Sequence, residues 1–390
     1  MNARVVEIGE VCTTGSGGTP LRKVPEFYGG HIPWVKSGDL RENELTEVSE
    51  YLTNLGLQKS SAKMVPKGAI LLAMYGATVG RVAMLGLDAA TNQAVCHIVP
   101  DPDQVFPRYL YYALRNKVPE FLRNAVGGAQ PNISQGIIRS TKVLLPPLPE
   151  QKRIAAILDK AGALRSKRQQ AIELADQFLR SVFLEMFGDP VSNPKGWQKG
   201  KIRDLVSEAK YGTSQKAHTE HRGVPVLRMG NITYEGGWDF SDLKYVELID
   251  KEYQKHRLQK GDLLFNRTNS KELVGKTAVF EEEKDMVAAG YLVRIRTNDL
   301  GNPYYISGYL NSKHGKQTLF SMCKSIVGMA NINAQEVQDI DILIPPKSVQ
   351  DRYEFLTKQM RLRTEKFNEA LRETEHLFAS LSSRAFSGNL

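Results

Sequence analysis

The stretch Leu145-Pro146-Pro147-Leu148-Pro149-Glu150-Gln151 decides the fold, because it recurs 199 residues further along the chain. Ile344-Pro345-Pro346 matches its double proline, and Gln350 stands where Gln151 stands in the first copy. More than thirty residues with almost no helix breaker follow each double proline. The chain therefore contains an internal repeat in which each copy ends in a long helix-forming segment.

Each of these segments predicts a helix that pairs with the other. Pro149 and Glu150 suit a first helical turn, and Ser348 and Asp351 have capping-box spacing. Apolar residues follow at alternating three- and four-residue steps for about four heptads, which is typical of a coiled coil. The seam positions are Ile154, Ile157, Ala161, Leu164, Ala171, Ala175, Phe178 and Val182, then Tyr353, Leu356, Met360, Phe367, Ala370, Leu377 and Leu381, with Arg168, Arg363 and Thr374 as polar interruptions.

The residues ahead of each helix repeat as well. The matching segments are 32–40 with 224–232, 67–72 with 260–265, 80–83 with 275–278, and 132–134 with 331–333. Their offset drifts from 192 to 199, as loop insertions and deletions produce. Short β-branched stretches alternate there with Gly, Pro and Asn, and helical patches interrupt them. Each copy therefore predicts a mixed α+β domain.

We predict an α+β fold with two similar mixed α/β domains separated by two long antiparallel helices, a coiled coil with a pseudo-two-fold repeat. The expected boundaries are 1–147 for domain one, 148–188 for helix one, 189–346 for domain two and 347–390 for helix two. If the helices pair they must run antiparallel, because helix one leads into domain two and helix two leaves it.

Composition narrows the class of protein. The 390 residues carry a formal charge of +9, and 41% are hydrophobic, which excludes wholesale disorder. No apolar run reaches the roughly 18 residues of a membrane span, and the first residues lack a signal-peptide core. We therefore expect a cytoplasmic protein. Three widely spaced cysteines do not predict a disulfide or zinc framework.

Catalytic motifs are incomplete. Gly275-Lys276-Thr277 resembles the end of a phosphate-binding P-loop, but Ser270 stands where the motif needs glycine. Asn302-Pro303-Tyr304 lacks the second proline of the amino-methyltransferase loop Asn/Asp-Pro-Pro-Tyr/Phe. His218 and His221 could recruit a metal, although a basic loop is the simpler interpretation. We predict a chain with no catalytic residues and no metal site.

Basic and amide side chains at corresponding loop positions favour DNA as a partner. Arginine and lysine neutralise phosphates, arginine reads guanine, and asparagine or glutamine reads adenine. The candidate DNA-binding residues are Lys36, Arg81, Gln130, Asn132, Arg228, Arg267, Lys276 and Asn331. Two related domains with different loops suit a bipartite, asymmetric DNA site, with half-sites about one helical turn apart, on the order of 34 Å.

The chain resembles the specificity subunit of type I restriction-modification systems over essentially its whole length. The resemblance rests on Gly17-Gly18-Thr19-Pro20, Ile32-Pro33-Trp34, Gly38-Asp39-Leu40, Asn132-Ile133-Ser134 and 145–151, with a looser second copy. It implies that the globular parts are target recognition domains and the helices are spacers. It also implies that this chain binds no cofactor and does not itself methylate or cut. Double-stranded DNA is the implied target, without contact to a membrane.

The same resemblance implies protein partners. Two modification subunits would methylate adenine with S-adenosylmethionine, and restriction subunits would cleave DNA with ATP and Mg²⁺. The helices would dock the modification subunits, and the candidate docking residues outside the seam are Ile172, Leu179, Phe183 and Phe187. Some of these could instead cover a neighbouring domain. A fused methyltransferase or nuclease, and a scaffold that does not bind DNA, remain as alternatives.

Overall fold

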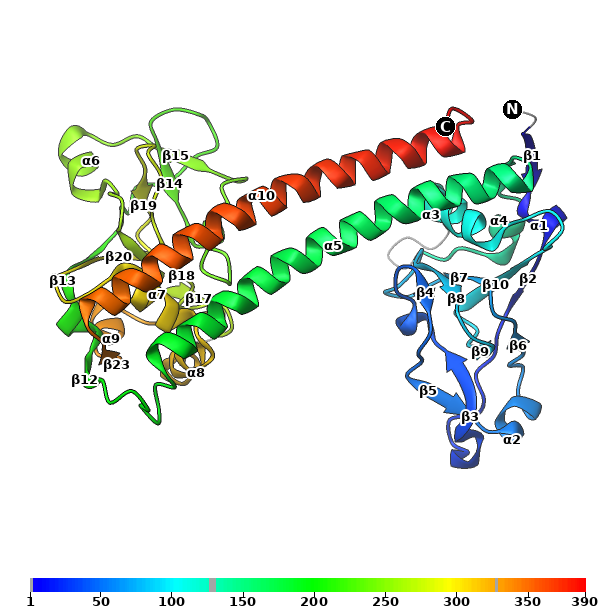
Figure 1. The fold of residues 1–390 in the computed structure, drawn as a ribbon, viewed down its shortest axis with the longest axis horizontal. Helices are drawn as coiled ribbons and strands as arrows, with labels where there is room; N and C mark the ends of the chain where they lie inside the picture. The colour runs from blue at the N-terminus through cyan, green and yellow to red at the C-terminus, as the bar shows by residue number, and fades with distance from the viewer. Residues whose placement is uncertain (1–2, 126–130, 327–328) are drawn as a thin grey trace. The chain divides into compact units, whose positions relative to one another are not determined.

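The chain folds into two compact units in a computed structural model that describes residues 3–125, 131–326 and 329–390 (Figure 1). Unit 1 comprises Met1–Arg168 and Ala370–Leu390, and unit 2 comprises Gln169–Glu369. Each unit holds one globular domain together with part of each long helix. In the part of the chain that is described, no helix combines the length and the apolar character that crossing a membrane requires.

Unit 1 is built on a five-stranded sheet of order β2-β10-β7-β8-β4 and a four-stranded sheet of order β5-β3-β9-β6. Its strands are β1 Arg4–Glu7, β2 Cys12–Ser16, β3 Tyr28–Val35, β4 Glu44–Leu45, β5 Glu50–Leu52, β6 Met64–Val65, β7 Ile70–Ala73, β8 Val82–Leu85, β9 Ala89–Thr91, β10 Val95–Pro100 and β11 Lys142–Leu145. Its helices are α1 Ile8–Val11, α2 Asn54–Gln58, α3 Pro107–Asn124 and α4 Gln135–Arg139, with 3₁₀ turns at Pro25–Phe27 and Ser37–Asp39. Strands β1 and β11 pair antiparallel as a separate ribbon.

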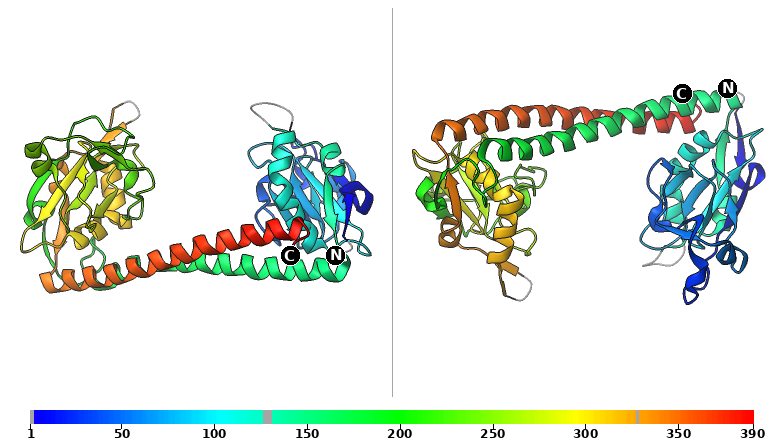
Figure 2. Two further views of the ribbon diagram at one scale, coloured as in Figure 1. Left: turned by 90° about the horizontal axis from the view of Figure 1, so that it is seen from above. Right: turned by 60° about the horizontal axis from the view of Figure 1, so that its bottom comes forward.

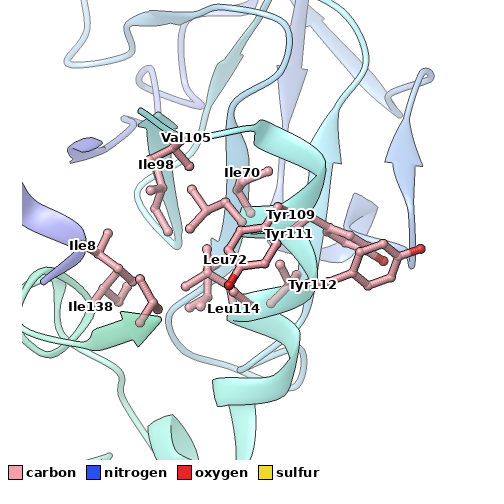
Figure 3. Close-up of a cluster of buried hydrophobic side chains, with 14 of the residues drawn as sticks. Ile8, Ile70, Leu72, Ile98, Val105, Tyr109, Tyr111, Tyr112, Leu114 and Ile138 are labelled. Atoms are coloured by element: carbon pink, nitrogen blue, oxygen red, sulfur yellow. The ribbon is translucent and has the colours of Figure 1, made fainter. Parts of the chain in front are cut away.

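Helix α3 provides one wall of the unit 1 core (Figure 3). Pro107 occupies its first turn, where a missing N–H costs nothing, and its buried face packs on β7 and β8. Figure 3 shows Tyr109 and Leu114 of α3 facing Ile70 and Leu72 of β7, all of them buried. The hydroxyl of Tyr109 donates to the Leu144 carbonyl oxygen at 2.7 Å, so this core also holds the strand that precedes the long helix.

Unit 2 repeats this plan with a four-stranded sheet of order β13-β20-β16-β18 and three-stranded sheets β15-β14-β19 and β17-β22-β21. Its strands are β12 Gln198–Lys201, β13 Val206–Tyr211, β14 Val224–Leu227, β15 Lys244–Val246, β16 Leu263–Asn266, β17 Thr268–Asn269, β18 Thr277–Val279, β19 Val287–Ala288, β20 Leu292–Thr297, β21 Lys324–Ile326, β22 Met329–Asn331 and β23 Asp341–Ile344. Its helices are α6 Asp250–His256, α7 Pro303–Asn311, α8 Lys313–Met322 and α9 Ala334–Gln338, with 3₁₀ turns at Ile202–Leu205 and Met229–Asn231.

The core of unit 2 contains the counterpart of the tyrosine contact in unit 1. Tyr305 of α7 is buried, and its hydroxyl donates to the Leu343 carbonyl oxygen at 2.6 Å. Leu343 and Leu144 are 199 residues apart, and each precedes a double proline. The repeat found in the sequence is therefore a repeat of packing as well. Thr277 begins strand β18, whereas a P-loop requires a helix at this point, so Gly275-Lys276-Thr277 is not a P-loop.

The two long helices are α5, Leu148–Phe187, and α10, Lys347–Phe386, each of 40 residues. Within unit 1, Arg153 near the start of α5 donates to the carbonyl oxygen of Leu390, just beyond α10, at 2.9 Å. Figure 2 shows the end of α10 beside the start of α5. Within unit 2, the ring of Phe187 at the end of α5 lies 5.4 Å from that of Tyr353 near the start of α10. The start of each helix thus lies beside the end of the other. These contacts confirm the predicted antiparallel pair and the α+β class.

The compact units divide each long helix near its middle, at 168/169 and 369/370, whereas the sequence predicts boundaries at the helix ends. The halves belong to different units because each half packs on the domain beside it. At the division, the Arg168 guanidinium donates to the Ala370 carbonyl and the Thr374 hydroxyl, and Thr374 is buried. The polar seam residues Arg168 and Thr374 are therefore partners of each other.

Candidate nucleic-acid interface

The first pair of repeated cations serves the same structural contact in both units. Lys36 follows β3 and lies 3.5 Å from a carboxylate oxygen of Glu50, and Arg228 follows β14 and lies 2.7 Å from one of Asp242. Each acid stands 14 positions after its cation. The Arg228 guanidinium also donates to the backbone carbonyl of Asp242 at 2.8 Å. The recurrence of Lys36 and Arg228 in the sequence thus reflects a repeated ion pair with an acid 14 positions further along the chain.

The second pair of repeated cations also supports loops. Arg81 donates to the Leu40 carbonyl oxygen at 3.4 Å, and Lys276 donates to that of Ile232, the equivalent residue of unit 2. Arg81 remains exposed, so it stays available to a ligand. Lys276 is only 8% exposed, and burial lowers the pKa of its ammonium group. The prediction of DNA contact by Lys276 is corrected here, because its charged end faces the protein interior.

The glycine-rich segment 15–20 serves close packing within unit 1 rather than close approach to a ligand. A Cβ atom on Gly17 would lie 1.7 Å from the carbonyl oxygen of Thr91, and the Gly18 carbonyl accepts from the Trp34 indole at 3.1 Å. Gly212 meets the same constraint in unit 2, where a Cβ would lie 2.1 Å from the Ala288 carbonyl oxygen. These positions need glycine because a neighbouring strand fills the space.

The remaining candidates are three amide residues and Arg267. Asn132 and Asn331 are both exposed, whereas Gln130 lies outside the described residues. In unit 2 the Asn331 side-chain oxygen accepts a hydrogen bond from Nε of Arg267 at 3.3 Å. The structure therefore brings two of the predicted residues together at the surface.

Tyr211, an aromatic residue that is not among the predicted DNA-binding residues, completes this cluster. The guanidinium carbon of Arg267 lies 4.7 Å from the ring centre of Tyr211, which is 42% exposed at the end of β13. An exposed tyrosine at the end of a strand is a signal that alone does not single out a binding residue. In unit 1, Arg22 stacks similarly on Tyr28 and Trp34, at 4.7 and 5.1 Å, but Glu50 neutralises its charge at 2.9 Å.

The docking candidates on α5 divide into buried and exposed residues. Phe183 and Phe187 are 4% and 2% exposed, and their rings lie 6.0 and 4.5 Å from that of Tyr305 in the core of unit 2. The prediction that they dock a partner is corrected, because they are enclosed by their own domain. Ile172 and Leu179 are half-buried.

Other apolar side chains of the helices face solvent. On α5 they include Leu174, 63% exposed, and Phe178, 48% exposed, one helical turn apart. The prediction that Phe178 lies in the seam between the helices is therefore wrong. On α10 they include Phe355 and Leu362, 61% and 54% exposed. Residues four or seven apart share a helix face, so each helix presents a short apolar strip.

The two histidines that stand three residues apart, His218 and His221, both lie beside Tyr245. The ring of His221 lies 4.6 Å from that of Tyr245, and the backbone of His218 pairs with Tyr245. Across residues 3–125, 131–326 and 329–390, no three potential metal ligands gather into one group.

Comparison with known proteins gives a family match in both copies. A family model described as "Type I restriction modification DNA specificity domain" matches residues 2–174 and again residues 194–370. The Methanocaldococcus jannaschii type I restriction enzyme MjaIX specificity subunit is 24% identical over 379 residues, which cover 92% of this chain and 85% of that protein. The Escherichia coli EcoKI specificity subunit is 24% identical over 387 residues, which cover 92% and 82%.

Two solved structures share the fold over nearly the whole chain. The S subunit of a type I restriction-modification system from M. genitalium has a TM-score of 0.62 at 13% identity, covering 99% of this chain and 96% of that one. A chain from a study of complex assembly and conformational transition of the type I R-M system has a TM-score of 0.60 at 19% identity, covering 100% and 98%.

Proposed function

The chain belongs to the family of type I restriction modification DNA specificity domains, which it contains twice, and we propose that it is the specificity subunit of a type I restriction-modification complex. The observation that carries this proposal is the match of one family model to both halves of the repeat. The predicted role in DNA recognition, as opposed to catalysis, is thereby confirmed at the level of the family.

Each copy then reads one half of a bipartite, asymmetric DNA site. We assign the target recognition domains to 1–147 and 189–346, and the spacer helices to 148–188 and 347–390. The asymmetry is supported by side chains that differ at equivalent surface positions on a common framework. Lys36, Arg81, Asn132, Arg228, Arg267 and Asn331 remain the predicted DNA-binding residues within the described part of the chain. The side chains of Arg81, Asn132 and Asn331 are exposed, and those of Lys36, Arg228 and Arg267 are half-buried. The charge of +9 favours binding to the duplex backbone.

The chemistry belongs to partner subunits in this proposal. Two modification subunits methylate adenine with S-adenosylmethionine, and restriction subunits use ATP and Mg²⁺ in the cytoplasm. The apolar strips Leu174 with Phe178 on α5 and Phe355 with Leu362 on α10 are the surfaces that we assign to docking the modification subunits. Their support is exposure, because apolar side chains of this size gain free energy when a partner covers them.

Mapping of methylated bases in whole genomes tests the proposed function. The chain is expressed with its cognate modification subunit in cells that lack adenine methylation, and the methylated bases are mapped by sequencing. We expect one bipartite motif with two defined half-sites and a spacer of constant length. Replacing residues 189–346 with the same region of a relative should change one half-site and leave the other intact.

Two outcomes would support the alternatives. Methyl transfer by the purified chain alone would indicate a fused methyltransferase. Absence of sequence preference at moderate salt, measured against competitor DNA, would indicate a scaffold, because phosphate contacts alone discriminate weakly.

A further inference from the structure

We propose that Arg267 is the guanine-reading residue of the second target recognition domain, held in its reading orientation by Tyr211 and Asn331. This inference rests on the proposed function and assigns a base preference to one residue of unit 2. Four observations carry it: a backbone fixed on both sides, an immobilised guanidinium group, unused hydrogen-bond donors, and a different side chain at the equivalent position of unit 1.

The backbone of Arg267 is fixed where the core strand β16 ends. Its N–H donates to the Tyr291 carbonyl oxygen at 3.1 Å, and its own carbonyl accepts from the N–H of Ile332 at 2.9 Å. The neighbouring segments therefore hold Arg267 on both sides. A reading residue needs such support, because a side chain on a loose loop loses more conformational entropy when it binds.

The side chain is fixed as well. Its guanidinium group stacks on Tyr211 at 4.7 Å, and its Nε donates to the side-chain oxygen of Asn331 at 3.3 Å. The hydroxyl of Tyr211 in turn accepts a hydrogen bond from the N–H of Ala334 at 3.1 Å, which anchors the ring. A stack and a hydrogen bond together define the plane of the guanidinium group.

The groups of Arg267 and Asn331 that have no partner among the described residues are hydrogen-bond donors. The oxygen of Asn331 also accepts from the hydroxyl of Thr268 at 3.5 Å, so the amide NH₂ of Asn331 points away from both donors. The two terminal nitrogens of Arg267 have no hydrogen-bond or carboxylate partner in the described ranges 3–125, 131–326 and 329–390. Unpaired donors of Arg267 and Asn331 favour a ligand that offers acceptors.

Arg267 is exceptional among the arginines of its domain. Residues 189–346 contain seven arginines, all within the described part of the chain. The other six form ion pairs: Arg203 with Asp339, Arg222 with Glu220, Arg228 with Asp242, Arg257 with Asp285, Arg294 with Glu208, and Arg296 with Asp262. A domain that neutralises six arginines within itself leaves one guanidinium group available to a partner.

The equivalent position of unit 1 carries Met74. The carbonyl of Met74 accepts from the N–H of Ile133 at 2.8 Å, which repeats the contact of Arg267 with Ile332. Met74 is 6% exposed, and Ser16 on β2 occupies the place of Tyr211 on β13. The backbone contact is thus kept in both copies while the stacked arginine is present in unit 2, and this difference suits two half-sites of unlike sequence.

Guanine is the base that matches this surface. Its major-groove edge offers two acceptors, O6 and N7, which pair with two parallel N–H groups of arginine. Adenine and cytosine present an amino donor in the same groove, which a donor surface cannot satisfy. A phosphate would also accept these hydrogen bonds, but it would give affinity without sequence preference. The proposal therefore predicts a specific guanine in the half-site of unit 2.

The experiment compares variants of the full chain in complex with the modification subunit. Arg267→Met introduces the residue of unit 1, and Arg267→Lys keeps the charge but removes the planar fork. Methylome mapping of both variants should show one guanine of one half-site become degenerate while the other half-site is unchanged. The parent protein should prefer the parent site over a site with that guanine replaced. In the variants, the ratio of the two affinities should fall about 5- to 150-fold. Arg203→Met, which removes an ion-paired arginine, is the control and should leave the motif intact.

Two results would overturn the proposal. An unchanged motif with a uniform loss of affinity for all sequences would assign Arg267 to a phosphate. An unchanged motif with unchanged affinity would remove it from the interface. Retention of the first half-site in Arg267→Met shows that the variant still folds and assembles. The unaltered chain distinguishes this proposal from the proposed function. If the unaltered chain directs no methylation motif, it is the proposed function that is wrong.

Discussion

The side-chain oxygen of Gln151 accepts a hydrogen bond from the backbone N–H of Phe106 at 2.8 Å, which joins the first turn of α5 to the residue that precedes α3. The amide of Gln151 donates to the carbonyl oxygens of Gln104 and Pro146, both at 2.8 Å. Gln350 makes the same three contacts in unit 2, to Asn302, Leu300 and Pro345. One buried glutamine in each copy thus fixes a long helix to the domain that precedes it.

We predict that Gln151→Ala lowers the free energy of unfolding of unit 1 by about 2–4 kcal/mol, because three buried backbone groups lose their partner. Urea unfolding followed by the fluorescence of Trp34, which is buried in unit 1, measures this loss. Gln58→Ala changes an exposed glutamine of unit 1, at the end of α2, and should alter stability by less than about 0.5 kcal/mol. Equal effects of the two variants would contradict the anchoring role.

Gly17→Ala should destabilise unit 1 by about 3 kcal/mol or more, because the added Cβ would overlap the Thr91 carbonyl oxygen and force two strands apart. Gly38→Ala is the matched control, since no atom lies within 4 Å of its added Cβ. Thermal unfolding distinguishes the two variants. Similar melting temperatures would show that the segment can move away from Thr91 at little cost.

Phe187→Ala should cost about 3–5 kcal/mol in unit 2, because it removes a ring packed 4.5 Å from that of Tyr305. Phe178→Ala on the same helix should cost less than about 1 kcal/mol, since Phe178 is half exposed. Chemical unfolding monitored through Trp197 and Trp238, both in unit 2, reports on these changes. A larger effect at Phe178 would reverse the assignment of the two faces.

Leu174→Glu combined with Phe178→Glu should weaken binding of the modification subunit at least about 10-fold, because a charge at a buried interface is costly. Native mass spectrometry of the mixed subunits measures the stoichiometry. The unfolding midpoint of the isolated chain serves as the control and should be unaltered. Full assembly of the double variant would exclude this strip as a docking surface.

Lys316→Met should stabilise unit 2 at neutral pH by about 1–3 kcal/mol. The Lys316 ammonium group is enclosed without a hydrogen-bond partner among the described residues. The ring of Tyr234, at 4.8 Å, and the charge of Glu235 offset its burial only in part. Burial, and next the charge of Lys276, lower its pKa to about 8. Because this value lies below the roughly 10.4 of an unfolded chain, the penalty applies below pH 8 and declines as the pH rises to about 10.

The difference in unfolding free energy between the parent chain and Lys316→Met should therefore shrink between pH 8 and about 10. Lys313→Met provides the control, because Lys313 is exposed at the start of the same helix. A difference that does not vary with pH would mean that packing, and not charge, accounts for the gain.

The repeat and the heptads were sufficient to predict the fold, because both follow from local spacing along the chain. The double prolines mark where α5 and α10 begin, and Gly188 follows the end of α5. The roles of single side chains were harder to predict. The loop motif that contains Lys276 would look the same in the sequence if its ammonium group faced water. In the folded chain this group instead contacts the carbonyl oxygen of Ile232, 44 residues away. That distinction exists only after the chain has folded.

Similar reasoning applies to the helix faces and to Arg267. Phe183 and Phe187 share a face by spacing alone, but which face meets the domain depends on the position of Tyr305. Arg267 was one cation among several in the sequence. It became distinct because the six other arginines of its domain have carboxylate partners, and such pairs join residues as far apart as Arg203 and Asp339. Cations that recur in both copies, such as Arg81 and Lys276, support loops. Arg267, which is replaced by Met74 in unit 1, is the better candidate for recognition of a base.

The ribbons β1–β11 and β12–β23 bring the first and last strands of each domain side by side, with Arg4 opposite Leu145 and Gln198 opposite Ile344. The chain therefore enters and leaves each domain at neighbouring points, and a long helix begins directly after the exit. A gene fragment cut at these points would encode a complete and self-contained module. New pairs of half-sites could then arise by exchanging one module between relatives, while the helices stay as they are.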